Sequence, residues 1–336
     1  MLIKFLTTIF VLLNPLNFLF GQPSEQVNLE EIQLSPELLP EVSSLSINFH
    51  PGLANVISSF VISASQGVNP DFLPIRDWNV DEPEVKAKAA LVFESDKDKI
   101  LYQKNIEEVL PVASLTKLMT GLIVLENLDL GQTAVVSQRA VKAYGDSGGL
   151  VIGEKITVRN LLYILLMESS NDAAIVFEES FQEEGMNLVD LMNEKTQYLG
   201  LNQTSFIEPT GYQPANLSSA LDLAKLVKYT LNQPLLWQIL KTTAVDLFSA
   251  DNSISHHLIN TNQLLNRWPN IIGGKTGYTE EAQGCLILVI EQTLDKMENY
   301  FDQDYSVRLI IVALGAEDRF LETEKLINWV NQAYIW

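Results

Sequence analysis

The sequence is poor in the residues on which metal sites, disulfides and histidine-based catalysis depend. Among 336 residues it has one cysteine, Cys285, and three histidines, His50, His256 and His257. Cys285 has no second cysteine with which to form an intrachain disulfide, and it lies in the apolar run CLILVI, which predicts a buried thiol rather than a nucleophile. The chain also lacks an H-E-x-x-H or paired-cysteine motif. These absences predict no metal site and no cofactor, and they give little support to a serine triad with a histidine base.

Positive charge is scarce as well. The chain has 22 Lys and Arg residues against 42 Asp and Glu residues, a formal net charge of −20 at pH 7. Such a chain is a poor partner for nucleic acid or for an anionic lipid surface, and a basic or zwitterionic partner suits it better. A large negative net charge also favours solubility, so it need not reflect a binding partner. The remaining composition, 47% hydrophobic and 19% charged, is that of a globular protein with a sizeable core.

The N-terminus has the pattern of an export signal. Residues 1–22 contain one cation, Lys4, followed by a largely apolar run over residues 5–20. The run is shorter than the roughly 20 residues of a membrane span. Cleavage after Gly21 would leave the bulky Leu19 where a small residue is preferred, so a cleaved signal peptide and an uncleaved N-terminal anchor both stay open. In either case the protein is predicted to be exported, to the periplasm or to the extracellular face of the cytoplasmic membrane.

Composition and periodicity divide the rest of the chain into a linker and one folded domain. Residues 23–80 are rich in Pro, Ser, Asn and Glu, which predicts a linker or pro-segment. The folded domain is predicted over residues 81–336. It begins with Ala89–Glu94 and Lys99–Lys104, two apolar segments that flank a polar turn and predict a β-hairpin.

Helical patterns fill the middle of this domain, and strand patterns return at its end. Strands at both ends of a domain imply one sheet assembled from distant segments. We therefore predict an α+β fold with a five-stranded antiparallel sheet, flanked by helices, and a mainly helical insert; the active site is expected where sheet and insert meet. Helices are expected after Pro111, at 158–169, after Asp172, and at 188–199, 219–231 and 320–336; strands are expected at 271–278, 285–290 and 308–314, with a surface loop at 291–306.

A serine and a lysine stand three residues apart in Ser114-Leu-Thr-Lys117. On a helix both side chains share one face, so the amine can take the proton of the hydroxyl and turn it into a nucleophile. A pair with this spacing arises by chance about once in a chain of this length. Alone, it indicates no more than a helix cap followed by a solvated lysine.

Two further elements change this interpretation. Ser169–Asn171 (SSN) interrupts an apolar helix, and Lys275–Gly277 (KTG) opens onto a strand. In this order, S-x-x-K, S-x-N and K-T-G form the signature of penicillin-binding proteins and of the related β-lactamases. The three elements together therefore predict a serine acyl-transfer site.

The first two elements have chemical tasks in such a site. Lys117 is the expected base for Ser114, because burial and the nearby positive charge of Lys275 would both favour its neutral form. Ser169 can pass the proton on to the leaving amine. Asn171 offers an amide that can hold both Lys117 and the substrate backbone.

The third element is expected to bind the end of the substrate. Lys275 and Thr276 supply a charge and a hydroxyl for a terminal carboxylate, and Gly277 lets the substrate approach the strand closely. The backbone amides of Ser114 and Tyr278 are the expected donors to the oxyanion.

With these motifs and several longer stretches, the sequence resembles the low-molecular-weight penicillin-binding D-alanyl-D-alanine carboxypeptidases. The resemblance runs from about Lys88 to Val330. It rests on VLPVASLTKLMTGLIVLE, GDSGGLVIGEKITVRNLLYILLMESSNDAA, GLNQTSFIEPTGY, NLSSALDLAKL, NTNQLL, GGKTGYTEEAQGCL and LGAEDRFLETEKLINWV.

This resemblance implies a β-lactamase/transpeptidase-like fold and removal of the terminal D-alanine from peptidoglycan stem peptides ending in D-Ala-D-Ala. It also implies an acyl-enzyme intermediate and covalent inhibition by β-lactams. An arginine near the end of the domain, Arg319, is the candidate for a further contact to the substrate carboxylate. Many family members have a C-terminal β-domain and an amphipathic membrane helix without counterpart here, so a membrane tether is expected at the N-terminus. Gln283 replaces a usual glycine and is expected to narrow or re-aim the turn after the K-T-G strand.

Three other functions remain open at this point. A D,D-endopeptidase uses the same groups. A secreted β-lactamase needs a further glutamate in an E-x-x-L-N context, and the nearest analogue, Glu208–Gly211 (EPTG), lacks the Leu-Asn pair. A non-catalytic wall-binding protein would not need all three elements, which are intact here.

Overall fold

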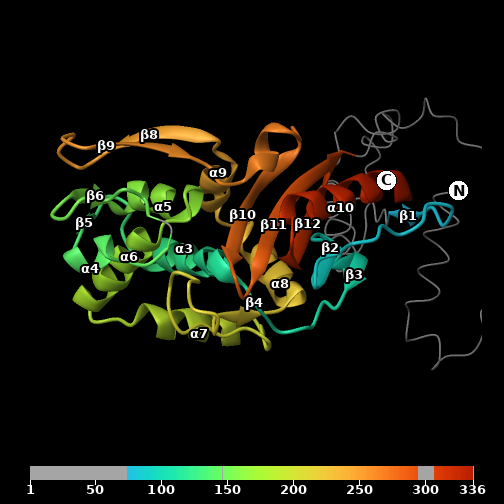
Figure 1. The fold of residues 1–336 in the computed structure, drawn as a ribbon, viewed down its shortest axis with the longest axis horizontal. Helices are drawn as coiled ribbons and strands as arrows, with labels where there is room; N and C mark the ends of the chain where they lie inside the picture. The colour runs from blue at the N-terminus through green and yellow to red at the C-terminus, as the bar shows by residue number, and fades with distance from the viewer. Residues whose placement is uncertain (1–73, 146, 294–305, 336) are drawn as a thin grey trace, which may run out of the picture. The chain divides into compact units, whose positions relative to one another are not determined.

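The computed structural model describes residues 74–145, 147–293 and 306–335 (Figure 1). The predicted signal or anchor, the predicted linker up to residue 73 and the centre of the predicted 291–306 loop lie outside the described residues. The first described strand, β1 (Ile75–Arg76), pairs with the last, β13 (Tyr334–Ile335). The folded domain therefore begins before the boundary predicted at residue 81. Its first strand has a partner at the far end of the chain, which local composition does not reveal.

One antiparallel sheet of five strands forms the centre of the domain. The strand order is β10-β11-β12-β2-β3, and each neighbouring pair is antiparallel. The predicted N-terminal hairpin and the three predicted C-terminal strands are confirmed as one sheet, in which β12 joins the end of the chain to β2. The strands are β2 (Ala89–Glu94), β3 (Lys99–Lys104), β10 (Ile271–Thr279), β11 (Gln283–Thr293) and β12 (Ser306–Ala316).

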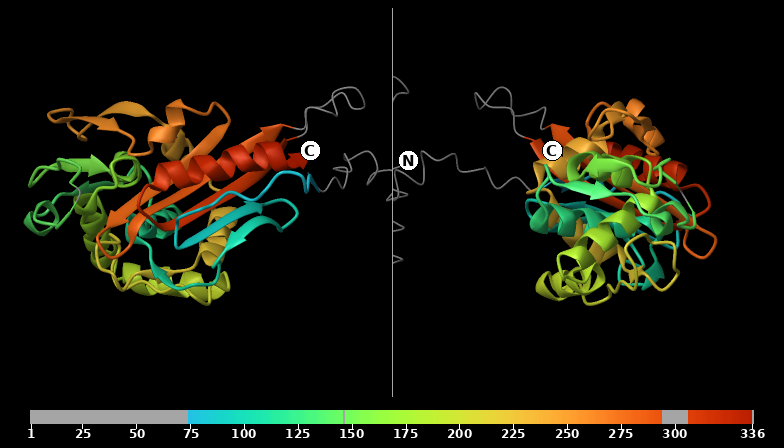
Figure 2. Two further views of the ribbon diagram at one scale, coloured as in Figure 1. Left: turned by 45° about the vertical axis from the view of Figure 1, so that its right-hand side comes forward. Right: turned by 90° about the vertical axis from the view of Figure 1, so that its left-hand side faces the viewer.

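Both faces of this sheet are covered, which explains why its central strands are almost continuously apolar. On β11, Leu286 and Leu288 belong to the core shared with helix α10 (Arg319–Ala333), and Figure 2 shows that helix lying across one face of the sheet. Cys285 and Ile287 belong to the core shared with the helical insert on the other face. Burial on both sides removes the alternation of a half-exposed strand. Cys285 is buried as predicted, and its burial raises the pKa of the thiol to about 11.

The predicted helical insert lies between β3 and β10 in sequence. Its predicted helices at 158–169, 188–199 and 219–231 end within two residues of the observed ones. Within the described ranges, no helix combines the length and apolar character that a membrane crossing needs. The insert contains η4 (Ala113–Leu115), α3 (Thr116–Asn127), α4 (Gln138–Val141), α5 (Val158–Met167), α6 (Asn171–Glu183), α7 (Leu188–Tyr198), α8 (Ala220–Thr230) and α9 (Pro234–Lys241), the strand pair β4 (Leu110–Pro111) and β7 (Leu217–Ser218), and the pair β5 (Thr133–Val135) and β6 (Lys155–Thr157).

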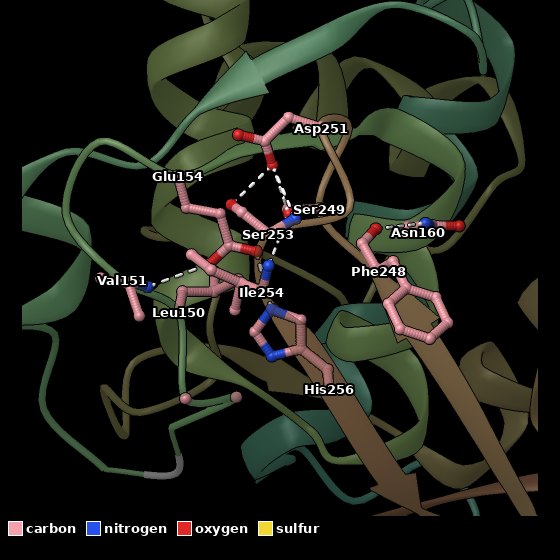
Figure 3. A network of polar contacts seen from close by, with 12 residues as sticks. Leu150, Val151, Glu154, Asn160, Phe248, Ser249, Asp251, Ser253, Ile254 and His256 are labelled. Atoms are coloured by element: carbon pink, nitrogen blue, oxygen red, sulfur yellow. Dashed lines mark hydrogen bonds and ion pairs between the residues drawn. The ribbon is translucent and has the colours of Figure 1, made fainter.

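A hairpin of β8 (Ala244–Phe248) and β9 (Ser255–Ile259) has no counterpart in the sequence prediction. In Figure 1 it runs above α5, and Figure 3 shows how its tip is held to the insert. The Asn160 side chain donates a hydrogen bond to the Phe248 carbonyl (3.0 Å), and His256 Nε2 lies 2.7 Å from Glu154 Oε1. Every second residue of this hairpin is exposed, so the apolar pattern was too weak to predict it.

Glu154 and His256 form a buried polar pair at this contact. Their side chains are 0% and 5% exposed, and Glu154 Oε2 also accepts a hydrogen bond from the Val151 backbone (3.1 Å). Next to the pair, Asp251 closes the hairpin turn. Hydrogen bonds from the serines of that turn lower the pKa of Asp251 to about 2.

Replacing Glu154 with alanine should lower the free energy of unfolding by about 3 kcal/mol, because His256 would stay buried without its partner. Asp246→Ala is the matched control. Asp246 contacts His257 at 2.7 Å on the same hairpin, but these side chains are 70% and 64% exposed, so the loss should stay below about 0.5 kcal/mol. Chemical denaturation measures both values. Similar losses in the two variants would contradict the structural role of the buried pair.

Candidate active site

Ser114 lies at the junction of the sheet and the insert, where the site was expected. It is part of η4, the short turn that leads into α3. Ala113 before it has a φ of 47°, a conformation that residues with a side chain rarely adopt. Gly211 packs against this turn so closely that a Cβ there would lie 2.0 Å from the Ala113 carbonyl oxygen. The turn that presents the hydroxyl is therefore held by backbone packing.

Lys117 is fully buried one helical turn after Ser114. Its Nζ lies 3.1 Å from Ser114 Oγ, 2.6 Å from Asn171 Oδ1 and 2.5 Å from the Thr210 carbonyl oxygen. A neutral amine has two N–H groups and one lone pair. With Asn171 and Thr210 accepting the two N–H groups, the lone pair can face the Ser114 hydroxyl, as a general base requires. Thr210 was missed by the sequence analysis because it contributes only a backbone oxygen.

The segment Ser169–Asn171 joins α5 to α6. Ser170 caps α6 through a hydrogen bond that its Oγ accepts from that helix's backbone (3.0 Å). Ser169 before it has a φ of 63° and accepts a hydrogen bond from Lys275 Nζ (2.8 Å). Asn171 Nδ2 donates to the Tyr144 carbonyl (2.5 Å), which leaves its second N–H for a substrate. The break between the helices thus places a hydroxyl and an amide side by side.

Strand β10 brings Lys275 and Thr276 to the same region. Lys275 is buried and donates to the Thr276 carbonyl oxygen (2.9 Å) as well as to Ser169. Thr276 Oγ1 lies 2.6 Å from Thr261 Oγ1, and the Thr261 backbone bonds to the end of α5 (3.0 Å). Thr261 was quoted in the sequence analysis only within the stretch NTNQLL. Its role as a partner of Thr276 follows from the tertiary structure.

Gly277 packs closely against η4. A Cβ at this position would lie 3.1 Å from both Ser114 N and the Val112 carbonyl oxygen. The absent side chain therefore makes room for η4, and close approach of the substrate to the strand at Gly277 stays a prediction. Arg319, at the start of α10, donates from Nη1 to the Gly277 carbonyl oxygen (3.3 Å), which places its guanidinium against the backbone of the K-T-G strand.

A cavity of about 580 Å³ opens beside Ser114. The predicted residues Asn171 and Tyr278 line it, whereas the buried residues Lys117, Ser169, Lys275 and Thr276 are not among its lining residues. The other residues that line it were given no role in the sequence prediction, since none belongs to the three motif elements. They are Gly145, Gly211, Tyr212, Gln213, Pro214, Thr279, Glu280 and Glu281.

Fold and site together define a class of protein. A serine with a buried lysine partner lies in η4, a second serine and an asparagine join two helices of the insert, and a Lys-Thr-Gly strand forms the edge of a five-stranded antiparallel sheet. This arrangement is that of the serine D,D-peptidases of the penicillin-binding type.

Residues 77–299 match the family of D-alanyl-D-alanine carboxypeptidases, peptidase S11, and the chain belongs to this family. It is 36% identical over 258 residues to D-alanyl-D-alanine carboxypeptidase DacF of Bacillus subtilis, a match that covers 74% of this chain and 63% of DacF. The chain therefore spans less than two thirds of that relative. It is also 30% identical over 260 residues to the D-alanyl-D-alanine endopeptidase of Pseudomonas aeruginosa, covering 76% of this chain and 80% of the endopeptidase.

Solved structures confirm the predicted transpeptidase-like fold. The crystal structure of the Streptomyces K15 DD-transpeptidase is 25% identical, with a TM-score of 0.67, and the match covers 75% of this chain and all of that one (100%). A D-alanyl-D-alanine carboxypeptidase from Mycobacterium tuberculosis H37Rv is 26% identical, with a TM-score of 0.66, over 79% of this chain and 99% of that one.

Proposed function

We propose that this chain removes the terminal D-alanine from peptidoglycan stem peptides ending in D-Ala-D-Ala, through an acyl-enzyme on Ser114. The observation that carries the proposal is the 3.1 Å contact between Ser114 Oγ and the buried Lys117 Nζ. The two carbonyl oxygens that also contact Nζ give the amine a fixed orientation toward the hydroxyl.

In the acylation step, Ser114 Oγ attacks the carbonyl carbon of the penultimate D-alanine while its proton passes to Lys117. The bond to the terminal D-alanine then breaks, and the leaving nitrogen receives a proton by way of Ser169. The backbone N–H groups of Ser114 and Tyr278 stabilise the oxyanion. Gly277 supports this step by letting η4 lie close to β10, the two elements that carry those N–H groups.

The terminal carboxylate is bound by Lys275 and Thr276, whose charge and hydroxyl both suit an anion. Arg319 adds positive charge next to the strand through its contact with the Gly277 carbonyl. Water then hydrolyses the ester on Ser114 and releases the shortened peptide. Because β-lactams acylate the same serine, they are the expected covalent inhibitors.

Glu208 is the nearest analogue of the β-lactamase glutamate, and its carboxylate forms hydrogen bonds within its own turn and to Asn216. Its carboxylate accepts hydrogen bonds from the backbone of Gly211 (2.8 Å) and Thr210 (2.6 Å) and from Asn216 Nδ2 (2.9 Å). These bonds hold the turn that presents the Thr210 carbonyl to Lys117. Glu208 therefore supports the base rather than activating water, and a penicillin adduct should be long-lived.

The endopeptidase relatives favour a second candidate function, cleavage of D,D cross-links by the same residues. Either activity takes place on peptidoglycan, outside the cytoplasm. Residues 1–22 would supply export, as a cleaved signal or as an N-terminal membrane tether.

The purified protein should release D-alanine from a peptide that ends in D-Ala-D-Ala with a free carboxylate. Amidating that carboxylate should lower kcat/KM about a hundredfold, because the charge-assisted contacts to Lys275 and Thr276 are lost. A D-alanine release assay on the two peptides measures the ratio. Rapid multiple turnover of penicillin without any D-alanine release would instead assign the chain to the β-lactamases.

A further inference from the structure

Thr261 joins the K-T-G strand to the helical insert. Its Oγ1 lies 2.6 Å from Thr276 Oγ1, and its backbone N–H donates to the Met167 carbonyl oxygen at the end of α5 (3.0 Å). Met167 is the second residue before Ser169, which accepts a hydrogen bond from Lys275 Nζ (2.8 Å). Two adjacent residues of β10 are therefore tied to the junction of α5 and α6, one of them by way of Thr261.

The position of Thr261 is fixed by an asparagine on either side of it. Asn260 Nδ2 donates to the carbonyl oxygen of Thr242 (2.9 Å), the residue that ends α9. Asn262 Oδ1 accepts a backbone hydrogen bond (3.1 Å) and so caps the short helix η5 (Gln263–Asn266). Asn262 N in turn donates to Asn260 Oδ1 (2.9 Å). The backbone that carries the Thr261 hydroxyl is therefore held from both sides.

The hydroxyls of Thr261 and Thr276 depend on each other for hydrogen bonding. Among the described residues, neither Oγ1 has a hydrogen-bond partner other than the opposite one. Thr276 is 4% exposed, so water has little access to its side chain. Two hydroxyls have two protons and use one of them for the bond between their oxygens. The second proton is left for a further acceptor.

The direction of this hydrogen bond decides which oxygen can serve a ligand. If Thr261 donates to Thr276, the Thr276 proton is left for the terminal carboxylate that the proposed function assigns to this site. If Thr276 donates to Thr261, its oxygen offers only lone pairs, which repel a carboxylate. An anion beside Lys275 and Thr276 therefore favours the first direction. In that direction the two bonds also strengthen each other, because each hydroxyl is polarised by its neighbour.

We infer that Thr261 is a positioning residue: its hydroxyl donates to Thr276 and turns the Thr276 O–H toward the terminal carboxylate of the substrate. This role rests on the proposed carboxypeptidase function, and it adds to that function a residue outside the three motif elements. Thr261 does not itself touch the substrate in this arrangement. Because its backbone is tied to Met167, its hydroxyl is held in place before the carboxylate binds.

Replacing Thr261 with valine keeps the branched shape and the backbone N–H but removes the hydroxyl. For a peptide that ends in D-Ala-D-Ala with a free carboxylate, kcat/KM for D-alanine release by the full chain should fall about tenfold, mainly through KM, because Thr276 loses its donor. With an amidated C-terminus the change should be about twofold at most, since a bond to a neutral group is weaker. Thr261→Ser retains the hydroxyl and should behave like the wild-type chain. Thr261→Ala repeats the test with a smaller side chain.

Two further variants separate positioning from a structural effect. Thr243 accepts a backbone hydrogen bond from Asn260 (2.9 Å) but has an exposed side chain, so Thr243→Val is the matched control and should keep the wild-type kcat/KM. In Thr276→Val the hydroxyl that Thr261 orients is absent. Adding Thr261→Val to that variant should therefore lower kcat/KM no further.

The possible failures are distinguishable. Losses of similar size on the free and the amidated peptide would overturn the positioning role in favour of a structural one. A further loss when Thr261→Val is added to Thr276→Val would overturn it too, because Thr261 would then contact the substrate separately. An unchanged or higher kcat/KM in a folded Thr261→Val protein would show that Thr276 is the donor.

Failure of the proposed function has a different signature. Release of D-alanine from neither peptide by the wild-type chain would overturn that function. Benzylpenicillin also carries a carboxylate, and its acylation of the chain would then still test Thr261. Acylation should be about tenfold slower in Thr261→Val than in the wild-type chain, and equal rates would overturn the positioning role.

Discussion

Replacing Ser114 with alanine should abolish covalent labelling by a fluorescent penicillin and release of D-alanine. The change removes the one oxygen that would form the acyl bond, and no rearrangement of Lys117 can replace it. The variant should still fold, because the substitution removes one hydroxyl and leaves the backbone packing of η4 against Gly211 and Gly277 in place. The free energy of unfolding should change by about 1 kcal/mol or less.

Gel fluorescence after incubation with the penicillin measures the adduct, and thermal unfolding tests the fold. Ser306→Ala, at an exposed serine at the start of β12, is the matched control and should label like the wild-type chain. Labelling of a folded Ser114→Ala protein would show that another residue is the nucleophile.

Replacing Lys117 with arginine should slow acylation by about a thousandfold. Arginine keeps the positive charge and can still donate to Asn171 and Thr210, but its guanidinium does not lose a proton at a workable pH. The Ser114 hydroxyl then has no lone pair beside it to accept its proton. The second-order rate constant for formation of the penicillin adduct reports this step directly. It is measured by quenching the labelling reaction at successive times.

Because Lys117 is fully buried, a larger side chain could also disturb the fold. Lys117→Met, which fits the same space without a base, separates the two effects: a folded methionine variant should be as slow as the arginine variant. Lys142→Arg, at an exposed lysine, should acylate normally. Near-normal acylation by a folded Lys117→Arg protein would exclude Lys117 as the base.

The central sheet and most of the insert could be predicted from the sequence because their signals are local. The hairpin Ala89–Glu94 and Lys99–Lys104 has the predicted bounds, since a polar turn between two apolar runs leaves few alternatives. Helix α8 (Ala220–Thr230) begins within one residue of the predicted start at 219. The β8–β9 hairpin and the β1–β13 pair could not be predicted, because the first is stabilised by a buried Glu154–His256 contact and the second by a partner at the other end of the chain.

The three catalytic elements were also visible in the sequence, but their surroundings were not. Ser114 and Lys117 are three residues apart, so helical geometry alone brings them together. Thr210 and Thr261 have no such signal. Thr210 contacts Lys117 through its backbone, and Thr261 meets Thr276 only when β10 and the insert come together.

By itself, the sequence determined which residues are candidates for the chemistry: a serine, a lysine within one helical turn of it, and a Lys-Thr-Gly strand. It did so because the motif residues are separated by short spacings in the sequence. A helix or a strand brings residues with such spacings close together. Only the tertiary structure decided how the groups are oriented. The contact of Lys117 with Thr210 spans 93 residues and that of Lys275 with Ser169 spans 106. Contacts over such separations depend on how the sheet and the insert pack, and packing is a property of the whole folded chain rather than of any segment.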